Sequence, residues 1–335
     1  MKYKALIVGI LSVFMMIMSC RVQEHDFPLL KGPYFGQYPP GNTPQVFEPE
    51  IVSTGLDELN SVFSPDGSEF YFCVRNAGGA VSIFQMKMKD ETWSAPSLFP
   101  FASRFGDIDV TMSPDGNKIL FCSLRPIPGR DQPNEDYDFW MAGREGDTWG
   151  DPIHLGGEIN SPSHDFYPMM SAGGAIYFSS QREGPGTNNI YRSELVDGKY
   201  TRAVKLGGAV NTEHREFDPY ISPDESLLIF TSNRPQGLGS GDLYISFKDK
   251  SGEWTPARNM GDRINSSGPE FCAQISPDGK YLFFTSARTS GRGAPERPFG
   301  YKDFKECHNR SQSGFCDIYW VSAEIIEELK PGGSR

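Results

Sequence analysis

The sequence predicts an all-β protein, namely a five-bladed β-propeller closed by an N-terminal strand that completes the last blade. Two observations lead to this prediction. A turn motif occurs five times, with marker serines 49, 58, 51 and 54 residues apart by subtraction of their positions. Each copy lies within a series of short apolar runs bounded by turn residues, as strands are. A period of about 50 residues with four strands in each unit is typical of propeller blades.

The turn motif reads Ser-Pro-Asp-Gly or a variant of it. Proline presets φ, aspartate bonds the local backbone and glycine accepts positive φ, so the motif suits a tight turn between two antiparallel strands. The copies are Ser64-Pro65-Asp66-Gly67, Ser113-Pro114-Asp115-Gly116, Ser171-Ala172-Gly173-Gly174, Ser222-Pro223-Asp224-Glu225 and Ser276-Pro277-Asp278-Gly279. Each is followed by an aromatic or β-branched run, which favours a strand over a helix.

The first strand of each blade carries an acid six residues before the marker serine: Glu58, Asp107, Asp165, Glu216 and Glu270. The second strand ends in a small residue and then a cation: Cys73 and Arg75, Ser123 and Arg125, Ser180 and Arg182, Ser232 and Arg234, Ser286 and Arg288. Because the two strands are antiparallel, we expect each acid and its arginine at the same end of the blade. Such pairs are either structural clamps or a charged ring around a central funnel.

The outer strands are less regular. A third strand follows in each copy, centred on Ile83, Phe139, Ile190, Leu243 and Ile318. A fourth is indicated by tails that start at Trp93, Trp149, Tyr200 and Trp254. The fifth copy stops after its third strand, and the segment 47–53 precedes the first copy where a blade tail belongs. We expect this segment to complete the last blade, which removes the open edges of the ring.

These motifs resemble the WD40-like PD40 repeats of the TolB-type propeller family, over roughly residues 47 to 322. The resemblance rests on the Ser-Pro-Asp-Gly turn, on the apolar strand that ends in Ser-x-Arg, and on Asp-Leu-Tyr or Asp-Ile-Tyr in the third strand. The resemblance is specific for the propeller fold. It implies little about activity, because that family includes scaffolds, binding modules and some enzymes.

The N-terminus predicts export. Residues 1–20 have a basic start and an apolar run, followed by Ser19-Cys20, which indicates a secretory signal. Ile17-Met18-Ser19-Cys20 resembles a bacterial lipobox with Cys20 as the lipidated residue, although an ordinary signal peptide is the alternative. We therefore expect a lipid-anchored cell-envelope protein, at the outer membrane and facing the periplasm or the cell surface. The expected domains are 1–20 signal, 21–46 flexible tether, 47–325 propeller and 326–335 tail.

The composition and the motifs limit which classes of partner and which kinds of active site are expected. The formal net charge of −11 argues against nucleic acid, since neutralising phosphates needs a basic surface. No phosphate loop, nucleophile elbow or zinc-protease motif is present, so no cofactor and no metal are expected. Cys307 and Cys316 flank a polar loop of an exported chain, and we expect them to form a disulfide. The remaining partner classes are an envelope protein or a glycan.

The ligand-site candidates are residues where the repeat is broken. Positions two beyond the acids differ in every copy: Asn60, Asp109, Tyr167, Asp218 and Cys272. The cations Arg182, Arg234 and Arg288 and the loop histidines His164 and His214 are expected on the same face, as are the long loops 126–137 and 289–315. The leading interpretation is a binding or scaffold module. The alternative is a glycoside hydrolase or polysaccharide lyase that uses inward carboxyls such as Asp109 and Asp218.

Overall fold

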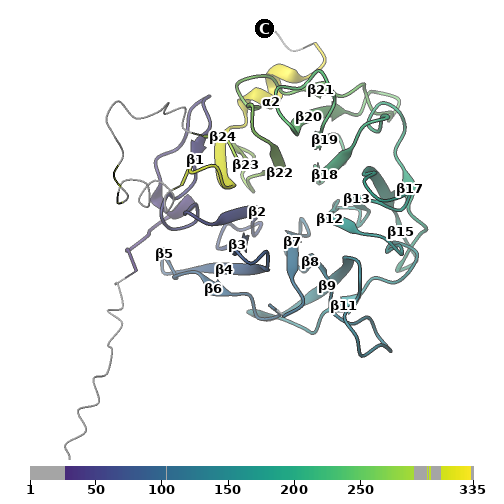
Figure 1. Ribbon diagram of the computed structural model, residues 1–335, viewed down its shortest axis with the longest axis horizontal. Helices are drawn as coiled ribbons and strands as arrows, with labels where there is room; N and C mark the ends of the chain where they lie inside the picture. Colours follow the sequence, from purple (N-terminus) through teal and green to yellow (C-terminus); the bar gives the residue numbers. More distant parts are fainter. Residues whose placement is uncertain (1–26, 103, 290–299, 301, 303–310, 333–335) are drawn as a thin grey trace, which may run out of the picture.

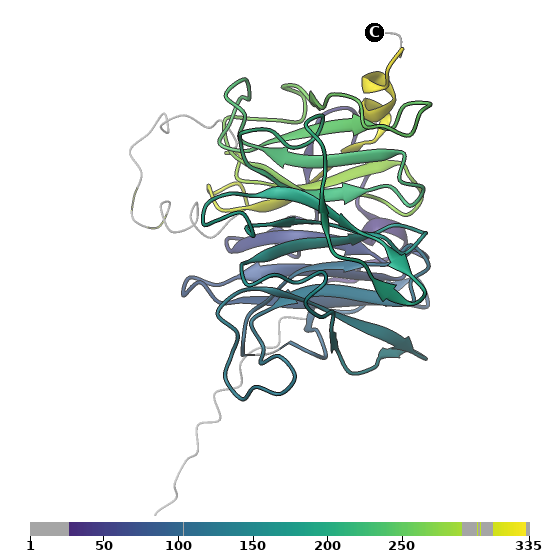
Figure 2. The ribbon, with the colours of Figure 1, turned by 90° about the vertical axis from the view of Figure 1, so that its right-hand side faces the viewer.

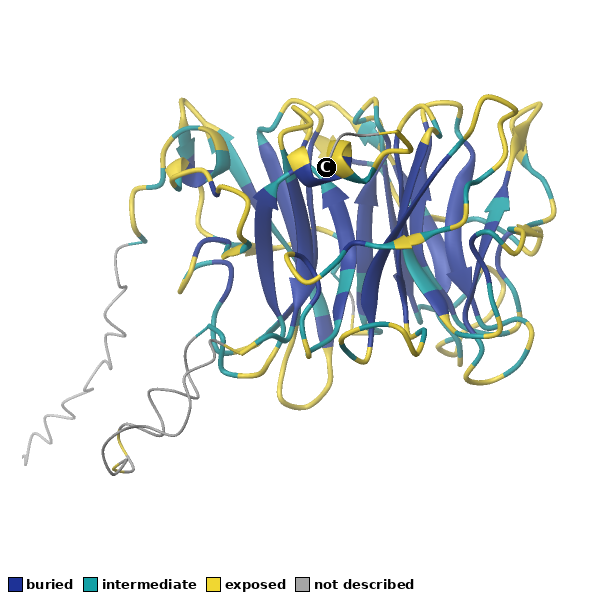
Figure 3. Cartoon of the chain, turned by 90° about the horizontal axis from the view of Figure 1, so that it is seen from above, coloured by how far each residue is buried: buried dark blue, intermediate teal, exposed yellow. Residues whose placement is uncertain are grey.

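The computed structural model describes residues 27–102, 104–289, 300, 302 and 311–332. Five small antiparallel sheets are arranged radially about one axis, as Figure 1 shows. The prediction of a five-bladed β-propeller is therefore confirmed. Seen edge-on, the strands run between two faces of loops, and buried residues lie along the strands while exposed residues lie on the two faces (Figures 2 and 3).

Each blade runs outward from its first strand, and the blades follow one another along the chain. Blade 1 contains β2(Asp57–Phe63), β3(Glu69–Arg75), β4(Val81–Lys89), β5(Thr92–Trp93) and β6(Ser97–Leu98). Blade 2 contains β7(Asp107–Met112), β8(Lys118–Ser123), β9(Asp138–Glu145), β10(Thr148–Trp149) and β11(Ile153–His154). Blade 3 contains β12(Asp165–Met170), β13(Ile176–Ser180), β14(Asn189–Ser193) and β17(Val204–Lys205), with the hairpin β15(Leu195–Val196) and β16(Lys199–Tyr200) at its edge.

Blades 4 and 5 complete the ring. Blade 4 contains β18(Glu216–Ile221), β19(Leu227–Ser232), β20(Asp242–Phe247) and β21(Arg258–Asn259). Blade 5 contains β22(Glu270–Ile275), β23(Tyr281–Ser286) and β24(Asp317–Ser322), and its fourth strand is β1(Gln45–Val46). The helix α2(Glu324–Leu329) follows β24 and buries Ile325 and Ile326, so it overlaps the tail expected from residue 326. Among the described residues, no helix is long and apolar enough to cross a membrane.

The closing strand lies two residues earlier than expected. Gln45 pairs with Trp320 and Val46 with Tyr319, while the backbone N–H of Phe47 donates to Ile318 at 2.8 Å. The expected segment 47–53 forms no strand of its own, but Ser53 returns to β24, where its hydroxyl donates to the Ile318 carbonyl and accepts from the Ile318 backbone N–H, both at 3.1 Å. The N-terminal strand still completes the last blade, as the sequence predicted.

The N-terminal segment before β1 also differs from the expected tether. Residues 33–36 form the 3₁₀ turn η1(Pro33–Gly36), and the side chain of Phe35 is only 3% exposed. The Phe35 ring lies 4.2 Å from that of Trp93, and the Trp93 indole N–H donates to the carbonyl of Gly32 at 2.8 Å. Aromatic burial thus fixes a segment that has no strand or helix periodicity. The expected signal peptide, the lipobox and Cys20 lie outside the described residues.

The Ser-Pro-Asp motif forms the turn between the first two strands of a blade. In the first blade the Ser64 hydroxyl donates to the Asp66 carboxylate at 2.5 Å and accepts from the backbone N–H of Glu69 at 2.9 Å. Blade 3 lacks the aspartate, and its Ser171 instead donates to Glu225 of the next turn at 3.0 Å. These turns define the turn face, and the opposite end of the blades, where the clamp arginines lie, is the arginine face.

Candidate functional site

In blades 2 to 5, the acid of the first strand forms an ion pair with the arginine that follows the second strand. The Asp107–Arg125 pair has an O···N distance of 2.9 Å, Asp165–Arg182 has 3.1 Å, and Glu216–Arg234 and Glu270–Arg288 have 3.2 Å each. The four acids are buried, and the arginine side chains are 11–19% exposed. Each arginine also donates to a backbone carbonyl of the preceding linker, at Phe101, Ile159, Val210 and Ile264.

Each clamp arginine also stacks on two aromatic rings of its own blade. The Arg234 guanidinium lies 4.7 Å from the ring of Tyr244 and 5.6 Å from that of Phe230. Hydrogen bonds and stacking thus occupy both the edge and the face of the guanidinium. This geometry favours the structural interpretation of Arg182, Arg234 and Arg288, because Nε and Nη2 of each guanidinium already donate within the protein.

Blade 1 departs from this pattern, and the sequence comparison was wrong there by one residue. Glu58 pairs across the ladder with Val74, whereas Glu216 pairs with Ser232. Val74 therefore occupies the clamp-serine position, Asn76 follows where the arginine belongs, and Arg75 points to the other side of the strand. Arg75 contacts Asp57 at 3.2 Å with 45% of its side chain exposed. It is thus a partly paired cation of the arginine face.

The five residues two beyond the acids form an axial ring: Asn60, Asp109, Tyr167, Asp218 and Cys272. Each lies where the ladder between the first two strands shifts register, which is the signature of a β-bulge. In blades 2 to 5 the backbone there is left-handed, with φ between 50° and 56°. A non-glycine residue in this region stores strain, which tends to occur at functional positions.

The axial ring links neighbouring blades. The Asn60 amide donates to the carbonyl of Val110 at 2.6 Å, and Asp109 accepts from the backbone N–H of Tyr167 at 3.1 Å. The Cys272 thiol contacts the Asp218 carboxyl at 3.5 Å. Four ring members are buried and Asp218 is half-buried. The candidates predicted from the broken repeat are therefore brought together, but mostly as contacts between blades.

Tyr167 closes the axis. Its hydroxyl donates to the carbonyl of Ala273 at 3.2 Å and accepts from the Gln274 amide at 3.1 Å. Since Tyr167 belongs to blade 3 and both partners to blade 5, the side chain reaches past blade 4 and across the centre. It is fully buried and fills part of the axis between the arginine face and the turn face.

The two ring carboxyls are not equivalent. Burial raises the pKa of Asp109, while hydrogen bonds from the Tyr167 backbone and the Cys122 thiol oppose the rise. Burial also raises the pKa of Asp218, and the nearby charge of Asp109 raises it further. Asp218 therefore holds a proton more strongly than Asp109 does.

This asymmetry predicts a pH dependence of stability. Because the pKa of Asp218 is raised by folding, the folded state binds the proton more strongly, and stability falls as pH rises above about 4 through the raised value. The variant Asp218→Asn cannot ionise at this position, so its stability should not fall in this way as pH rises. Urea unfolding at pH 5, 7 and 9 should show the variant gaining stability relative to the wild type with increasing pH. Parallel stability curves would contradict the assignment.

The histidines do not join the carboxyls. His164 accepts from the backbone N–H of Tyr137 at 3.1 Å and stacks on Phe166 with ring centroids 5.4 Å apart. His214 lies with Arg215 in a polar recess of about 370 Å³ between blades 3 and 4. Within the described part of the chain, no three or more His, Cys, Asp or Glu residues are grouped as a metal site would need.

The loops and the cysteines are only partly described. The blade 2 loop lies over the arginine face and presents Tyr137 to His164. In the blade 5 loop, residues 290–299, 301 and 303–310 lie outside the described residues. Cys307 is among them, so its pairing with Cys316 stays a prediction. Burial raises the pKa of the Cys316 thiol to about 12, and the neighbouring Asp57 contributes.

Sequence reasoning missed Arg215 and one face, and it assigned Arg75 to a clamp that Arg75 does not form. Arg75 and Arg215 are both exposed on the arginine face, and neither belongs to a clamp. A register-based comparison of the first two strands would have found Arg75, since acids pair with serines in the other blades. The turn face was interpreted as structural alone, yet a pocket lies there on the axis.

No family model matches the chain, and no curated protein matches it. Among solved structures it is similar to TolB from Acinetobacter baumannii, with 14% identity and a TM-score of 0.49 over 80% of this chain and 57% of that one. A putative TolB from Agrobacterium tumefaciens shows 16% identity and a TM-score of 0.46 over 79% and 90% of the two chains. The Hadza microbial sialidase Hz136 shows 15% identity and a TM-score of 0.42 over 68% and 53%. The chain thus spans little more than half the length of the first of these proteins.

Proposed function

We propose that this chain is a lipid-anchored cell-envelope propeller that acts as a binding or scaffold module for a protein partner or a glycan. The ligand docks on the arginine face around the axis. The exposed Arg75 and Arg215, together with the half-buried Asp218, His164 and His214, form the recognition set there. Anchoring through Cys20 would place this face in the periplasm or at the cell surface.

The observation that carries the proposal is the closed axis. Tyr167 and the bonds between blades link the members of the axial ring, and two of its five members, Asp109 and Asp218, carry carboxyls. A rigid, closed floor beneath exposed charged side chains suits recognition. Rigid positioning also lowers the entropy that binding must overcome. In addition, Asn60 Oδ1 is buried without a hydrogen-bond partner in the described structure, which leaves an acceptor unsatisfied beneath this face.

The enzymatic alternative keeps one supporting observation. Asp109 and Asp218 have unequal proton affinities, which is the condition that glycoside hydrolysis places on its acid and base. The burial of Asp109 between blades counts against direct access of a sugar ring to that carboxyl. The alternative is a hydrolase or lyase of envelope carbohydrate, and turnover distinguishes it from binding.

Binding is tested with the anchored protein and an envelope fraction, alongside a glycan array. The double variant Arg75→Gln plus Arg215→Gln should weaken capture by about fivefold or more, since exposed arginines are frequent binding hot spots. The matched control, Arg258→Gln plus Arg263→Gln, removes the same charge from exposed positions of blade 4 and its tail. Equal capture by the wild type and both variants would rule out the arginine face as the docking surface.

A further inference from the structure

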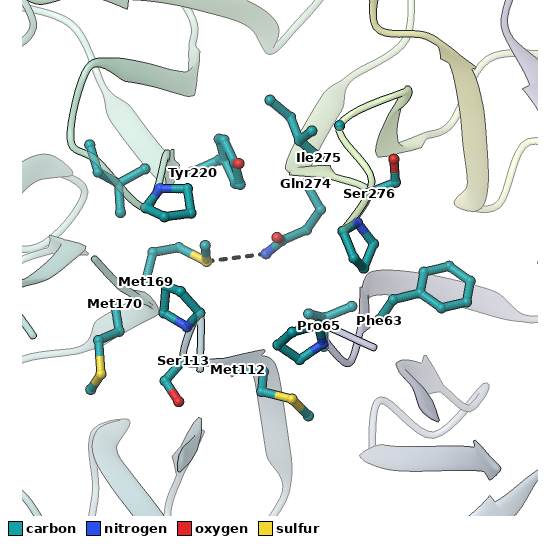
Figure 4. A pocket seen from close by; sticks show the side chains of 16 residues that line it. Phe63, Pro65, Met112, Ser113, Met169, Met170, Tyr220, Gln274, Ile275 and Ser276 are labelled. Carbon is teal, nitrogen blue, oxygen red and sulfur yellow. Dashed lines mark hydrogen bonds between the residues drawn. The ribbon is translucent and has the colours of Figure 1, made fainter. Parts of the chain in front are cut away.

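The turn face has an apolar pocket on the propeller axis, with a volume of about 270 Å³. All five blades contribute to it, and Figure 4 shows their side chains around one centre. Its lining comes from the ends of the first strands, among them Met112, Met169, Tyr220 and Gln274, and from the turns that follow. The motif that shapes each blade therefore also shapes a common recess.

The pocket has a polar side chain at its base and flexible methionine side chains in its walls. Gln274 points to its centre, with the amide nitrogen 3.1 Å from both the Tyr167 hydroxyl and the Met169 sulfur (Figure 4). Met112, Met169 and Tyr220 form the deeper wall and are each only 5–6% exposed. Methionine side chains adapt to the shape of a bound apolar group, so these walls can close around one.

Prolines of the turn motif line the opening of the pocket, and an aspartate follows each of these prolines in the sequence. The prolines are Pro65, Pro114, Pro223 and Pro277, and we call the aspartates that follow them the rim aspartates. Blade 3 has Ala172 instead, and its backbone N–H donates to the carbonyl of Pro223 at 2.8 Å. This bond joins the turns of blades 3 and 4. Asp66 and Asp278 line an adjoining recess that shares Phe63, Pro65 and Pro277 with the pocket.

The four rim aspartates stay ionised at neutral pH. Hydrogen bonds from Ser113 and the Asn117 backbone lower the pKa of Asp115 to about 2, and a bond from Ser222 lowers that of Asp224. For Asp66 and Asp278, partial burial raises the pKa, but hydrogen bonds from serine side chains and backbone N–H groups, and from Tyr34 to Asp278, together lower it below its usual value. Two lysines are close by in the sequence. Lys118 follows the blade 2 turn, and Lys280 pairs with Asp278 at 3.1 Å. Arg144 also reaches the blade 2 turn, where it donates to the Gly116 carbonyl, and Arg192 and Lys248 pair with Glu225 of the blade 4 turn.

We propose that this pocket binds a basic peptide segment of a partner protein, with one large apolar side chain in the pocket and flanking Lys or Arg side chains at the aspartate rim. Charge complementarity identifies the partner as cationic. The pocket is smaller than the 300–1,000 Å³ that is typical of small-molecule sites, so a single side chain fits it better than a drug-sized ligand. The prolines offer no backbone N–H to sugar hydroxyls, which disfavours a glycan. The site is independent of the arginine face.

The test uses methyl NMR of the mature chain labelled at its methionine methyl groups. The probe is an end-capped pentapeptide with one phenylalanine between two lysines. Shifts are expected for Met112, Met169 and Met170, which line the pocket, and not for Met86 or Met260, which are buried in blades 1 and 4. The same peptide with glutamates for lysines, or alanine for phenylalanine, should bind more weakly.

A rim variant separates charge from shape. Asp115→Asn plus Asp224→Asn keeps the acceptor oxygens of the turns and removes two charges, so we expect affinity for the lysine peptide to fall about 2-fold to 30-fold. High salt should weaken binding by the wild type in the same direction. No methionine shift at millimolar peptide would overturn the proposal, as would equal binding of the glutamate peptide. Shifts induced only by neutral oligosaccharide would overturn it in favour of a glycan site. Failure of the arginine-face variants to affect capture has no bearing on this result.

Discussion

Replacing Arg234 with alanine is expected to lower the free energy of unfolding by about 3–5 kcal/mol, because the change leaves a buried carboxylate without its partner. Glu216 is fully buried and takes hydrogen bonds from the Arg234 guanidinium at 3.2 Å and from the Ser232 hydroxyl at 3.0 Å. Arg234 also donates to the carbonyl of Val210 at 2.7 Å, which ties the linker between blades 3 and 4 to the clamp. Urea unfolding of the mature chain measures the loss.

The control for this prediction is Arg75→Ala. Arg75 has the same residue type at nearly the same place in the repeat, but it pairs with Asp57 on the surface with 45% of its side chain exposed. Surface ion pairs contribute about 0–1 kcal/mol, so this variant should remain close to the wild type. Equal losses for the two variants would mean that the clamp geometry does not decide stability.

Replacing Phe35 with alanine is expected to destabilise the protein by about 3–5 kcal/mol, the range measured for truncation of a buried phenylalanine. Phe35 packs against Trp93 and Phe70, with ring centroids 4.2 Å and 5.4 Å away, and joins the segment before β1 to blade 1. Thermal and urea unfolding both report the change. Blade closure is also affected, since β1 begins ten residues after Phe35.

Tyr38→Ala is the matched control, because Tyr38 lies three residues beyond Phe35 and is 88% exposed. It should leave stability within about 0.5 kcal/mol of the wild type. If Phe35→Ala were equally silent, residues 27–46 would be a tether after all, and closure would rest on β1 alone.

The fold was predictable because the blade pattern occurs five times in the sequence. Turn chemistry at Ser64-Pro65-Asp66-Gly67 and its copies, the short aromatic strands and the missing fifth tail define both the blade and its closure. The segment at Pro33–Gly36 was not predictable, because its burial depends on tertiary aromatic contacts and not on periodicity. Its backbone even takes left-handed φ at Tyr34 and Phe35, which no local preference of these residues favours.

The candidate site was predicted in position but not in character. Variation at Asp109, Tyr167 and Asp218 marked the bulged residues correctly, yet burial and the reach of the Tyr167 side chain past blade 4 follow only from the three-dimensional arrangement. Arg75 was misplaced because a one-residue shift turns a side chain to the other face of its strand. The pocket on the turn face was not predicted, because the Ser-Pro-Asp-Gly motif was interpreted only as a turn and not also as the lining of a binding site.

Turnover of envelope glycan tests the central claim, that this propeller binds rather than cleaves its ligand. The wild type and the variant Asp109→Asn plus Asp218→Asn are incubated with purified envelope glycan, and the masses of all released products are measured. We predict that neither protein changes the mass of the glycan. Shorter fragments formed by the wild type and abolished in the carboxyl variant would contradict the claim and establish the axial carboxyls as catalytic.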